Sequence, residues 1–312
     1  MKDKIRSICI FGPTASGKSA LALRLARDLG GTIISADSMQ IYRGMDVGTA
    51  KPSKEERDLV PHKMIDVCGP NERFSVYQYQ EMARDEIHSA HRNGSCPIVV
   101  GGTGLYVDAL LNNTDFGEID SDAAVHEKLL KRFESEGGAA LLSELSAIDP
   151  ETAKPLHEKD AKRILRALEV YYSTGRTMTS FKEESHTGKN PVSYLCFNLC
   201  FHDRQRLYDR IDRRVDEMLE KGLIQETKRL FFSGETGQTA SQAIGYKELF
   251  PYIKDEEPLD SCVALLKQRS RNYAKRQITW FKRYVDAVPL WMDGENDPYT
   301  ILKERSLDFL KS

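Results

Sequence analysis

A glycine-rich stretch near the start of the chain, GPTASGKS at Gly12–Ser19, restricts the possible folds more than any other feature of the sequence. Its spacing, a glycine separated by four residues from Gly-Lys-Ser, is that of a phosphate-binding P-loop. The β-branched run Ile5–Phe11 precedes it and an apolar helical pattern in Ala20–Leu29 follows it, which predicts a strand, the loop and a helix in that order. We therefore expect a site for a di- or triphosphate group, with a chance glycine-rich turn as the alternative.

Strands and helices continue to alternate after the P-loop. TIISAD is expected to be a strand with Asp37 at its carboxyl end; HKMIDV and CPIVVGGTG are expected to follow as strands, separated by a helix at Ser75–Asn93. This alternation predicts a doubly wound parallel sheet flanked by helices, whose ligands gather at the carboxyl ends of the strands. Asp37 and Thr103 should then share one rim with the P-loop. Alternatively, Asp37 only caps a turn and Thr103 only caps the helix that follows it.

The pattern changes near residue 120. The sequence from there to Gly175 has helical periodicity without a strand signal, SHTGKNPV has the composition of a linker, and SYLCFNLCF returns as an apolar strand. We therefore predict a P-loop NTPase-like α/β core in two segments, 1–119 and 193–312, with an all-helical domain inserted at 120–192. The remainder of the second segment should be mostly helical, with one apolar helix face marked by Leu207, Ile211, Val215 and Met218.

Composition narrows the possible classes of protein. The formal net charge is only −2, so a nucleic-acid surface would need local segregation of charge. The six cysteines form no C-x-x-C pair; we expect them to be reduced, and we do not expect them to bind a metal. The N-terminal segment reads as a first strand rather than a signal peptide, and no apolar stretch approaches the roughly 18 residues that span a membrane. A cytoplasmic protein without a membrane segment is expected.

The strand that could support nucleotide hydrolysis lacks the residue for it. P-loop NTPases usually place a magnesium-holding aspartate at the end of an apolar strand. The best candidate strand here, PIVVGG, ends in glycines. Hydrolysis of a triphosphate is therefore less strongly supported than binding of a phosphate group.

A basic and aromatic segment, Lys267–Tyr284, suggests contact with RNA. It contains no acidic residue, and at helical spacing Arg269, Tyr273, Arg276, Trp280 and Arg283 fall near one stripe. Basic side chains can hold phosphates while aromatic rings stack on unpaired bases. The alternative is a solvated basic helix face whose aromatic side chains turn inward.

With these pieces placed, the chain resembles the bacterial tRNA dimethylallyltransferases over nearly its whole length. The resemblance rests on GPTASGKS, SADSMQIYRGMDVGTAKP, PHKMIDV, VVGGTGLY, KRILRALEVYY, AIGYKE and KRQITWFKRY, in the order of the family. It implies transfer of a dimethylallyl group from dimethylallyl diphosphate to N6 of the adenosine at tRNA position 37, next to the anticodon, with release of pyrophosphate. The P-loop would then hold a prenyl diphosphate, and an acid for γ-phosphate cleavage would not be needed.

The resemblance also implies roles for individual residues. It implies three catalytic residues: Asp37 as the general base, Thr103 in contact with the target nucleotide, and Arg214 reaching the diphosphate. The implied donor-binding residues are Gly12, Thr14, Ala15, Ser16, Gly17, Lys18 and Ser19, and the Ser19 hydroxyl would hold Mg²⁺. The implied tRNA-binding residues are Asp37, Ser38, Met39, Gln40, Thr103, Lys162, Arg163, Ile164, Leu165, Arg166, Gln242, Ala243, Ile244, Gly245, Tyr246, Lys247, Lys275, Arg276, Gln277, Ile278, Thr279, Trp280, Phe281 and Lys282.

The implied partners are dimethylallyl diphosphate and tRNA, whose anticodon stem-loop the helical insertion would clasp; we expect a monomer. Two departures from the family are mild. Ser19 replaces the threonine of some relatives and keeps a hydroxyl, and AKRIL corresponds loosely to a glutamine-led segment of the family.

Three other functions remain open at the level of sequence: an adenylate isopentenyltransferase, a P-loop metabolite kinase and a non-catalytic RNA-binding protein. The insertion and the basic segment argue against the first, because a nucleotide-sized acceptor needs neither.

Overall fold

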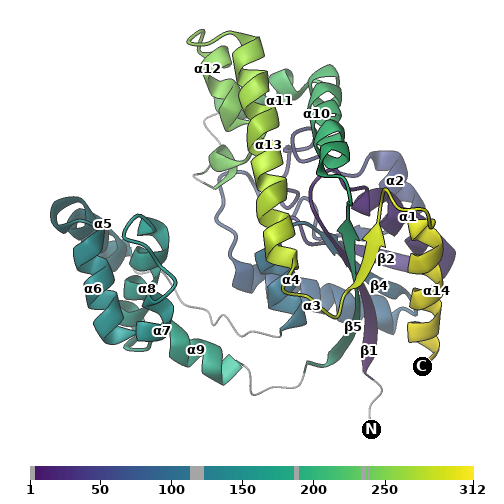
Figure 1. The fold of residues 1–312 in the computed structure, drawn as a ribbon, viewed down its shortest axis with the longest axis horizontal. Coiled ribbons are helices and arrows are strands. Elements are labelled where there is room, and N and C mark those ends of the chain that lie inside the picture. Colours follow the sequence, from purple (N-terminus) through teal and green to yellow (C-terminus); the bar gives the residue numbers. More distant parts are fainter. Residues whose placement is uncertain (1–3, 113–122, 186–189, 233–236, 238) are drawn as a thin grey trace. The chain divides into compact units, whose positions relative to one another are not determined.

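The computed structural model describes residues 4–112, 123–185, 190–232, 237 and 239–312. The chain divides into two compact units (Figure 1). The first, called the core unit here, comprises Met1–Leu111 and Pro191–Ser312, and the second, called the helical unit, comprises Asn112–Asn190. Each unit has its own buried apolar core.

The core unit is built on one parallel sheet. Its strands are β1 (Ile5–Phe11), β2 (Gly31–Ser35), β3 (His62–Lys63), β4 (Cys96–Gly101), β5 (Val192–Cys200) and β6 (Val288–Trp291). They lie in the order β3-β2-β4-β1-β5-β6, and each adjacent pair is parallel. The predicted α/β fold is therefore confirmed. The sequence pattern does not predict β6, which pairs with β5 at the edge of the sheet; Pro289 is compatible with an edge strand.

Helices cover both faces of the sheet. Those of the core unit are α1 (Lys18–Leu29), α2 (Lys54–Leu59), α3 (Val76–Arg92), α4 (Gly104–Leu111), α10 (Arg204–Glu220), α11 (Leu223–Phe232), α12 (Phe250–Ile253), α13 (Leu259–Phe281) and α14 (Pro298–Lys311), with the 3₁₀ turns η1 (Ala240–Gln242) and η2 (Lys247–Leu249). Helices α1 and α14 pack on one face, and α3 and α4 pack on the other.

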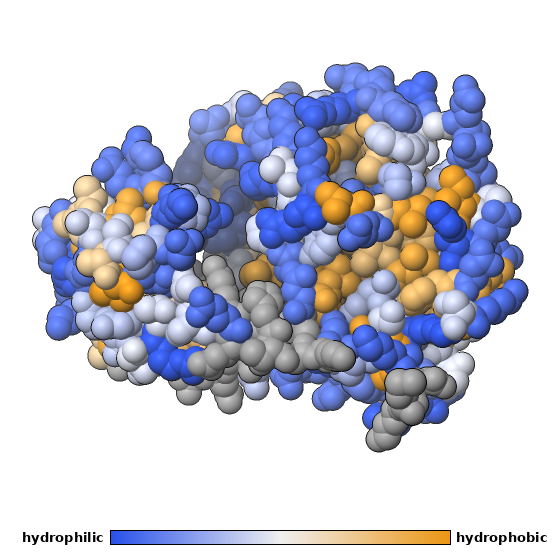
Figure 2. All heavy atoms as spheres, turned by 60° about the horizontal axis from the view of Figure 1, so that its bottom comes forward, coloured by the Kyte–Doolittle hydropathy of each residue, from blue (hydrophilic) through white to orange (hydrophobic). Residues whose placement is uncertain are grey.

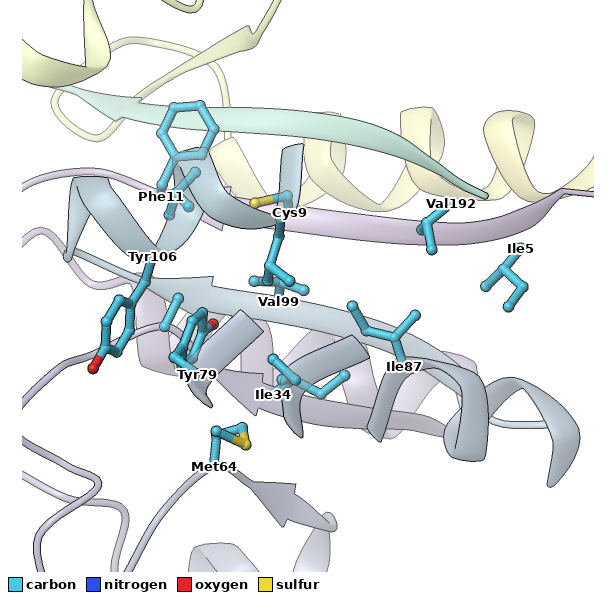
Figure 3. Packing of buried hydrophobic residues seen from close by; sticks show 14 of the residues in the cluster. Ile5, Cys9, Phe11, Ile34, Met64, Tyr79, Ile87, Val99, Tyr106 and Val192 are labelled. Carbon is cyan, nitrogen blue, oxygen red and sulfur yellow. The ribbon is translucent and has the colours of Figure 1, made fainter. Parts of the chain in front are cut away.

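Strand β1 shows why a buried parallel strand is apolar on both sides. Cys9 and Phe11 point to the α3/α4 face, whereas Ile8 and Ile10 point to the α1/α14 face, because successive side chains of a strand alternate. Figure 3 shows the first of these two layers, with residues from β1, β2, β4 and β5 packed against α3 and α4. This layer holds β1 in place, and the P-loop begins directly after β1.

A second group of helices lies beyond the carboxyl ends of the strands (Figure 1). Helices α10, α11 and α13 pack together with the loop that follows β2, around Tyr42, Met45, Val215 and Leu266. The predicted apolar face of α10 is observed: Leu207, Ile211 and Val215 are buried, and the partly exposed Met218 packs against the cluster that contains Val215. These helices place further side chains next to the P-loop.

The described part of the helical unit contains helices only. They are α5 (Ala123–Glu136), α6 (Gly138–Ile148), α7 (Pro150–Ala153), α8 (Ala161–Thr174) and α9 (Met178–Ser185). Leu129, Leu141, Leu145, Ile164 and Leu168 form its buried core. The unit therefore has its own folding core, as an inserted domain requires.

The face shown in Figure 2 is mainly hydrophilic, with its broadest hydrophobic area on the core unit and smaller hydrophobic areas on the helical unit. Across the described residues, no helix combines the length and the hydropathy that crossing a membrane would need. All six cysteines are free thiols.

Candidate active site

The P-loop has the backbone that its sequence predicts. Gly12 has φ 151° and Gly17 has φ 99°, a region that only glycine enters easily. A Cβ on Gly12 would also lie 2.9 Å from the Cβ of Leu199, so β5 approaches the loop too closely for any other residue. Helix α1 starts at Lys18, directly after Gly17, and its first N–H groups face the loop, where an anion is stabilised.

Two side chains of the loop, Lys18 and Ser16, can donate hydrogen bonds to an anion. The Lys18 ammonium donates to the carbonyl of Pro13 at 2.8 Å. The hydroxyl of Ser16 is buried and has no hydrogen-bond partner. Burial lowers the pKa of Lys18 to about 7; the charge of Arg214 adds to this effect, and Asp37 opposes it. These interactions place Lys18, Arg214 and Asp37 within electrostatic reach of one another.

Helix α10 brings Arg210 and Arg213 to the P-loop in addition to Arg214, the one of the three predicted from the sequence. Arg210 donates from Nε to the carbonyl of Ala15 at 2.8 Å. Arg213 and Arg214 line a pocket of about 400 Å³ together with Lys18 and Ser19. Burial lowers the pKa of Arg214, while Asp37 and Glu217 raise it. The spacing of the three arginines, with positions three and four apart on one helix face, is a signal that the sequence contains.

Asp37 follows β2 at the rim where β1 and β4 also end. One of its carboxylate oxygens accepts from the N–H of Met39 at 2.9 Å. Thr103 is bonded to the same turn. Its hydroxyl accepts from the N–H of Ser38 at 3.0 Å, and its backbone N–H donates to the carbonyl of Ala36 at 3.1 Å. The carbonyl of Thr103 also accepts the first bonds of α4. Asp37 and Thr103 therefore belong to one hydrogen-bonded rim.

A pocket of about 320 Å³ joins several of the predicted segments in the core unit. It combines aliphatic side chains of α10 and α13 with the polar rim. Its lining residues are Thr14, Ala15, Asp37, Ser38, Met39, Gly48, Thr49, Ile211, Arg214, Val215, Met218, Gln242, Ala243, Ile244, Gly245, Lys247, Leu266, Ser270, Tyr273 and Arg276. One cavity is thus shared by four segments that lie far apart in sequence: the P-loop, the Asp37 turn, residues 242–247 and helix α13.

One wall of this pocket depends on a buried carboxylate. Glu226 on α11 accepts from the backbone N–H groups of Asp46, Val47 and Gly48 at 2.9, 2.9 and 3.0 Å. It also accepts from the hydroxyl of Tyr246 at 2.6 Å. Tyr246 is buried, so its side chain acts inside this wall rather than on an open surface. No sequence motif marked Glu226.

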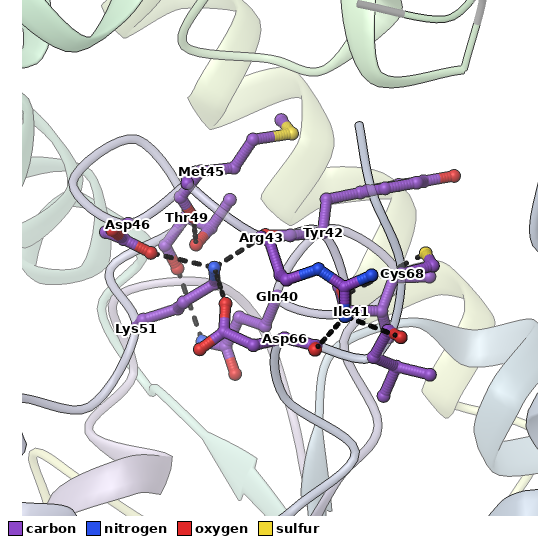
Figure 4. A network of polar contacts seen from close by, with 12 residues as sticks. Gln40, Ile41, Tyr42, Arg43, Met45, Asp46, Thr49, Lys51, Asp66 and Cys68 are labelled. Atoms are coloured by element: carbon purple, nitrogen blue, oxygen red, sulfur yellow. Dashed lines mark hydrogen bonds and ion pairs between the residues drawn. The ribbon is translucent and has the colours of Figure 1, made fainter. Parts of the chain in front are cut away.

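The loop after β2 is fixed by a second polar network (Figure 4). The ammonium of Lys51 donates to the carbonyl of Tyr42 at 2.6 Å and bonds Asp46 and Asp66 at 2.8 and 2.5 Å. Burial would raise the pKa of Asp66, but the bonds from Lys51 and Arg57 lower it. Gln40 is predicted to bind RNA, but its amide is already bonded within the loop. Its oxygen accepts from the Ser35 hydroxyl, and its nitrogen donates to the carbonyls of Thr49 and Ala50.

Helix α13 contacts both the P-loop and the start of α4. Gln277 is buried between Thr14 and Gly102, and the buried ring of Phe281 stacks on Phe11 with ring centroids 4.6 Å apart. Trp280 is partly exposed and donates to Asp108 at 3.2 Å. Phe281 therefore belongs to the core, whereas Tyr273 lines the pocket and Trp280 keeps part of its ring exposed. Contact of these two rings with RNA stays a prediction. Among the predicted tRNA-binding residues 275–282, the exposed ones are Lys275, Arg276, Thr279 and Lys282, while Ile278 is partly buried.

The predicted RNA-binding residues of the helical unit, 162–166, also include both exposed and buried side chains. Lys162 and Arg163 are exposed at the start of α8, and Arg166 is partly exposed. Ile164 and Leu165 belong to the core of the unit. Within the described residues, no group of three or more His, Cys, Asp or Glu side chains is arranged to hold a metal ion.

Comparison with known proteins identifies the family. The family model described as IPP transferase matches residues 40–284, and the model described as isopentenyl transferase matches residues 5–66. The chain belongs to the IPP transferase family. The tRNA dimethylallyltransferase of Halothermothrix orenii is 44% identical over 99% of this chain and 94% of that protein. The protein of the same name from Thermoanaerobacter sp. (strain X514) is 42% identical over 98% of each chain.

Solved structures of the family share the fold. The tRNA isopentenylpyrophosphate transferase of Bacillus halodurans superimposes with a TM-score of 0.71, at 39% identity and 99% coverage of both chains. A eukaryotic dimethylallyltransferase acting on tRNA gives a TM-score of 0.80 at 30% identity and covers 98% of this chain and 79% of its own.

Proposed function

We propose that this protein transfers the dimethylallyl group of dimethylallyl diphosphate to N6 of the adenosine at position 37 of tRNA and releases pyrophosphate. The observation that carries the proposal is the pocket in which the start of the P-loop, Asp37, Arg214 and Arg276 meet. Membership of the IPP transferase family supports the reaction class, and the relatives named tRNA dimethylallyltransferases support tRNA as the acceptor.

The diphosphate end of the donor fits the P-loop and α10. Backbone N–H groups of the loop, the Lys18 ammonium and the Arg214 guanidinium would face the phosphate oxygens, with Arg210 and Arg213 close by. A phosphate oxygen would also give the buried Ser16 hydroxyl the partner that it lacks. As the bond between C1 and oxygen breaks, negative charge grows on the leaving pyrophosphate, and preorganised cations stabilise that charge.

The residues present fit a magnesium ion of the kind that accompanies phosphates. Mg²⁺ keeps several waters and is often bound by one or two protein oxygens together with substrate phosphates. Ser19 places an exposed hydroxyl in the pocket that contains Lys18, and no larger set of protein ligands is needed. Bound there, Mg²⁺ would neutralise charge on the diphosphate.

Asp37 is the proposed general base. The adenine amine is a weak nucleophile because its lone pair is delocalised into the ring. In the transfer, N6 forms a bond to C1 of the dimethylallyl group, the C1–O bond breaks, and its electron pair leaves with pyrophosphate. The proton of N6 passes to the Asp37 carboxylate, one oxygen of which already accepts from Met39. Thr103, bonded to Ser38, would contact the target nucleotide.

Exposed cations would hold the RNA. The exposed cations are Lys275 and Arg276 on α13, Lys282 directly after it, and Lys162 and Arg163 on α8. Phosphate contacts made by such side chains position a nucleic acid. The target base must leave the stack of the anticodon loop to enter a pocket, as base-modifying enzymes require. We further propose that the protein acts as a monomer in the cytoplasm, which a sedimentation experiment and cell fractionation would test.

One assay separates this function from its alternatives. Labelled dimethylallyl diphosphate is offered with an unmodified anticodon stem-loop, with the same RNA carrying guanosine at position 37, and with AMP. Label should enter the adenosine RNA alone, with one pyrophosphate released for each group transferred. Transfer to AMP would favour an adenylate isopentenyltransferase. Consumption of ATP with a metabolite acceptor would favour a kinase, and RNA binding without any turnover would contradict an enzymatic role.

A further inference from the structure

Gln277 connects two segments that the proposed reaction must keep in register. Its carbonyl oxygen accepts from the N–H of Thr14 at 2.8 Å, and its amide nitrogen donates to the carbonyl of Gly102 at 2.8 Å. The side chain is only 5% exposed. Both ends of one buried amide are therefore satisfied, one by the P-loop and the other by the turn between β4 and α4.

The two segments belong to opposite sides of the reaction. Thr14 lies in the loop proposed to hold the diphosphate of the donor. Gly102 precedes Thr103, whose N–H bonds Ala36 and whose hydroxyl bonds Ser38. The Gly102 turn and the Asp37 turn are thus tied together, and Gln277 spans from this pair to the P-loop.

Close packing leaves this arrangement little freedom. A Cβ on Gly101 would lie 2.1 Å from the carbonyl oxygen of Ala36, and a Cβ on Gly102 would lie 2.3 Å from the amide nitrogen of Gln277. The backbones of the β4 turn and the Asp37 turn therefore touch, and the Gln277 amide lies directly on the turn. A change at either Gly102 or Gln277 must alter the same contact.

We propose that Gln277 is a positioning residue that sets the distance between the diphosphate in the P-loop and the base Asp37. The inference rests on the proposed prenyl transfer. Gln277 does not itself line the pocket, and its effect passes through its bonds to Thr14 and Gly102. Because a misplacement of about 1 Å can slow a reaction about 100-fold, loosening this link should slow transfer while each substrate still binds.

Gln277→Met tests the inference because methionine has a similar length but can make neither bond. The single-turnover rate with both substrates saturating should fall about 10- to 100-fold. The dissociation constants for pyrophosphate and for the anticodon stem-loop should change by less than about threefold, since the groups proposed to bind them remain. Gln268→Met, at an exposed position of the same helix, is the matched control and should keep the parental rate.

Gly102→Ala tests the same link from the other side and keeps the inference falsifiable if Gln277→Met does not fold. Apart from Gln277, the nearest atom to the new Cβ is the carbonyl oxygen of Gly12 at 3.5 Å, so the substitution should displace the Gln277 amide and little else. The single variant should slow transfer as Gln277→Met does, and the double variant should be no slower than either, because coupled residues are not additive.

The outcomes are distinct. The positioning role would be overturned if the rate losses of the two single variants multiplied in the double variant. It would also be overturned if Gln277→Met kept the parental single-turnover rate. A loss of affinity for pyrophosphate or for the stem-loop well beyond about threefold would assign Gln277 to substrate binding and would overturn it as well. A parent protein that transfers no dimethylallyl group to RNA would instead reject the proposed function, which separates the two failures.

Discussion

Removing the Glu226 carboxylate should destabilise the core unit strongly. Glu226→Ala leaves three backbone N–H groups and the Tyr246 hydroxyl without their acceptor. An unpaired buried donor costs about 1–3 kcal/mol. Asp46 is exposed and its N–H can bond water instead. The N–H groups of Val47 and Gly48 and the hydroxyl of the buried Tyr246 remain, so we expect a loss of roughly 3–9 kcal/mol in the free energy of unfolding. That is a large part of the ~5–15 kcal/mol typical of a folded domain.

Urea unfolding followed by tryptophan fluorescence measures this loss. The chain has two tryptophans, Trp280 and Trp291, and both lie in the core unit, so the signal reports that unit. Tyr246→Phe removes one of the four bonds while Glu226 keeps its other three partners, and should cost about 1–2 kcal/mol. Gln225→Ala, at an exposed neighbouring position, should be nearly neutral. A change of less than about 1 kcal/mol in Glu226→Ala would refute the reasoning.

Other predictions concern the donor and the RNA. Lys18→Ala should abolish donor binding and leave tRNA affinity largely intact; an equal loss of RNA affinity would contradict this separation. Burial beside Arg214 lowers the pKa of Lys18 to about 7, and only the charged form attracts an anion, so pyrophosphate affinity should fall by up to about tenfold per pH unit above pH 7. Titration calorimetry should find that Lys18→Arg removes this dependence, and a flat parental profile would contradict it. Arg276→Ala should lower the salt slope of tRNA binding by about 1. Trp280→Ala should cost about 1–3 kcal/mol of RNA affinity, whereas a lower melting temperature with intact affinity would assign the ring to packing.

Local sequence patterns predict the parts of the site that local structure builds. The P-loop, the strand before it and the helix after it depend on residues within one short stretch, and the structure contains all three. Asp37 and Thr103 lie on one rim because parallel strands bring their carboxyl ends together, which follows from the alternation of strands and helices. Their chemical roles stay predictions.

Residues that act through tertiary contacts could not be predicted in this way. Glu226 matters because it accepts from backbone groups that lie far away in sequence. Gln277, named for RNA binding, instead bonds two distant segments, and no local pattern indicates that role. Whole segments assigned to RNA also mix two kinds of position: Lys162 and Arg163 are exposed, whereas Ile164 is buried. Helical periodicity could have separated them, since a face that packs on a core alternates with a solvated one.

The single-turnover rate of Asp37→Asn, with both substrates saturating, tests the central claim most directly. Asparagine keeps the shape and the bond to Met39 but removes most of the basicity of the carboxylate. If Asp37 takes the N6 proton, the variant should bind donor and tRNA nearly as the parent does, and its rate should fall about 10²–10⁴-fold, the usual effect of losing a positioned base. A rate within a few-fold of the parent would contradict the account, and Asp37 would then serve only to hold its turn.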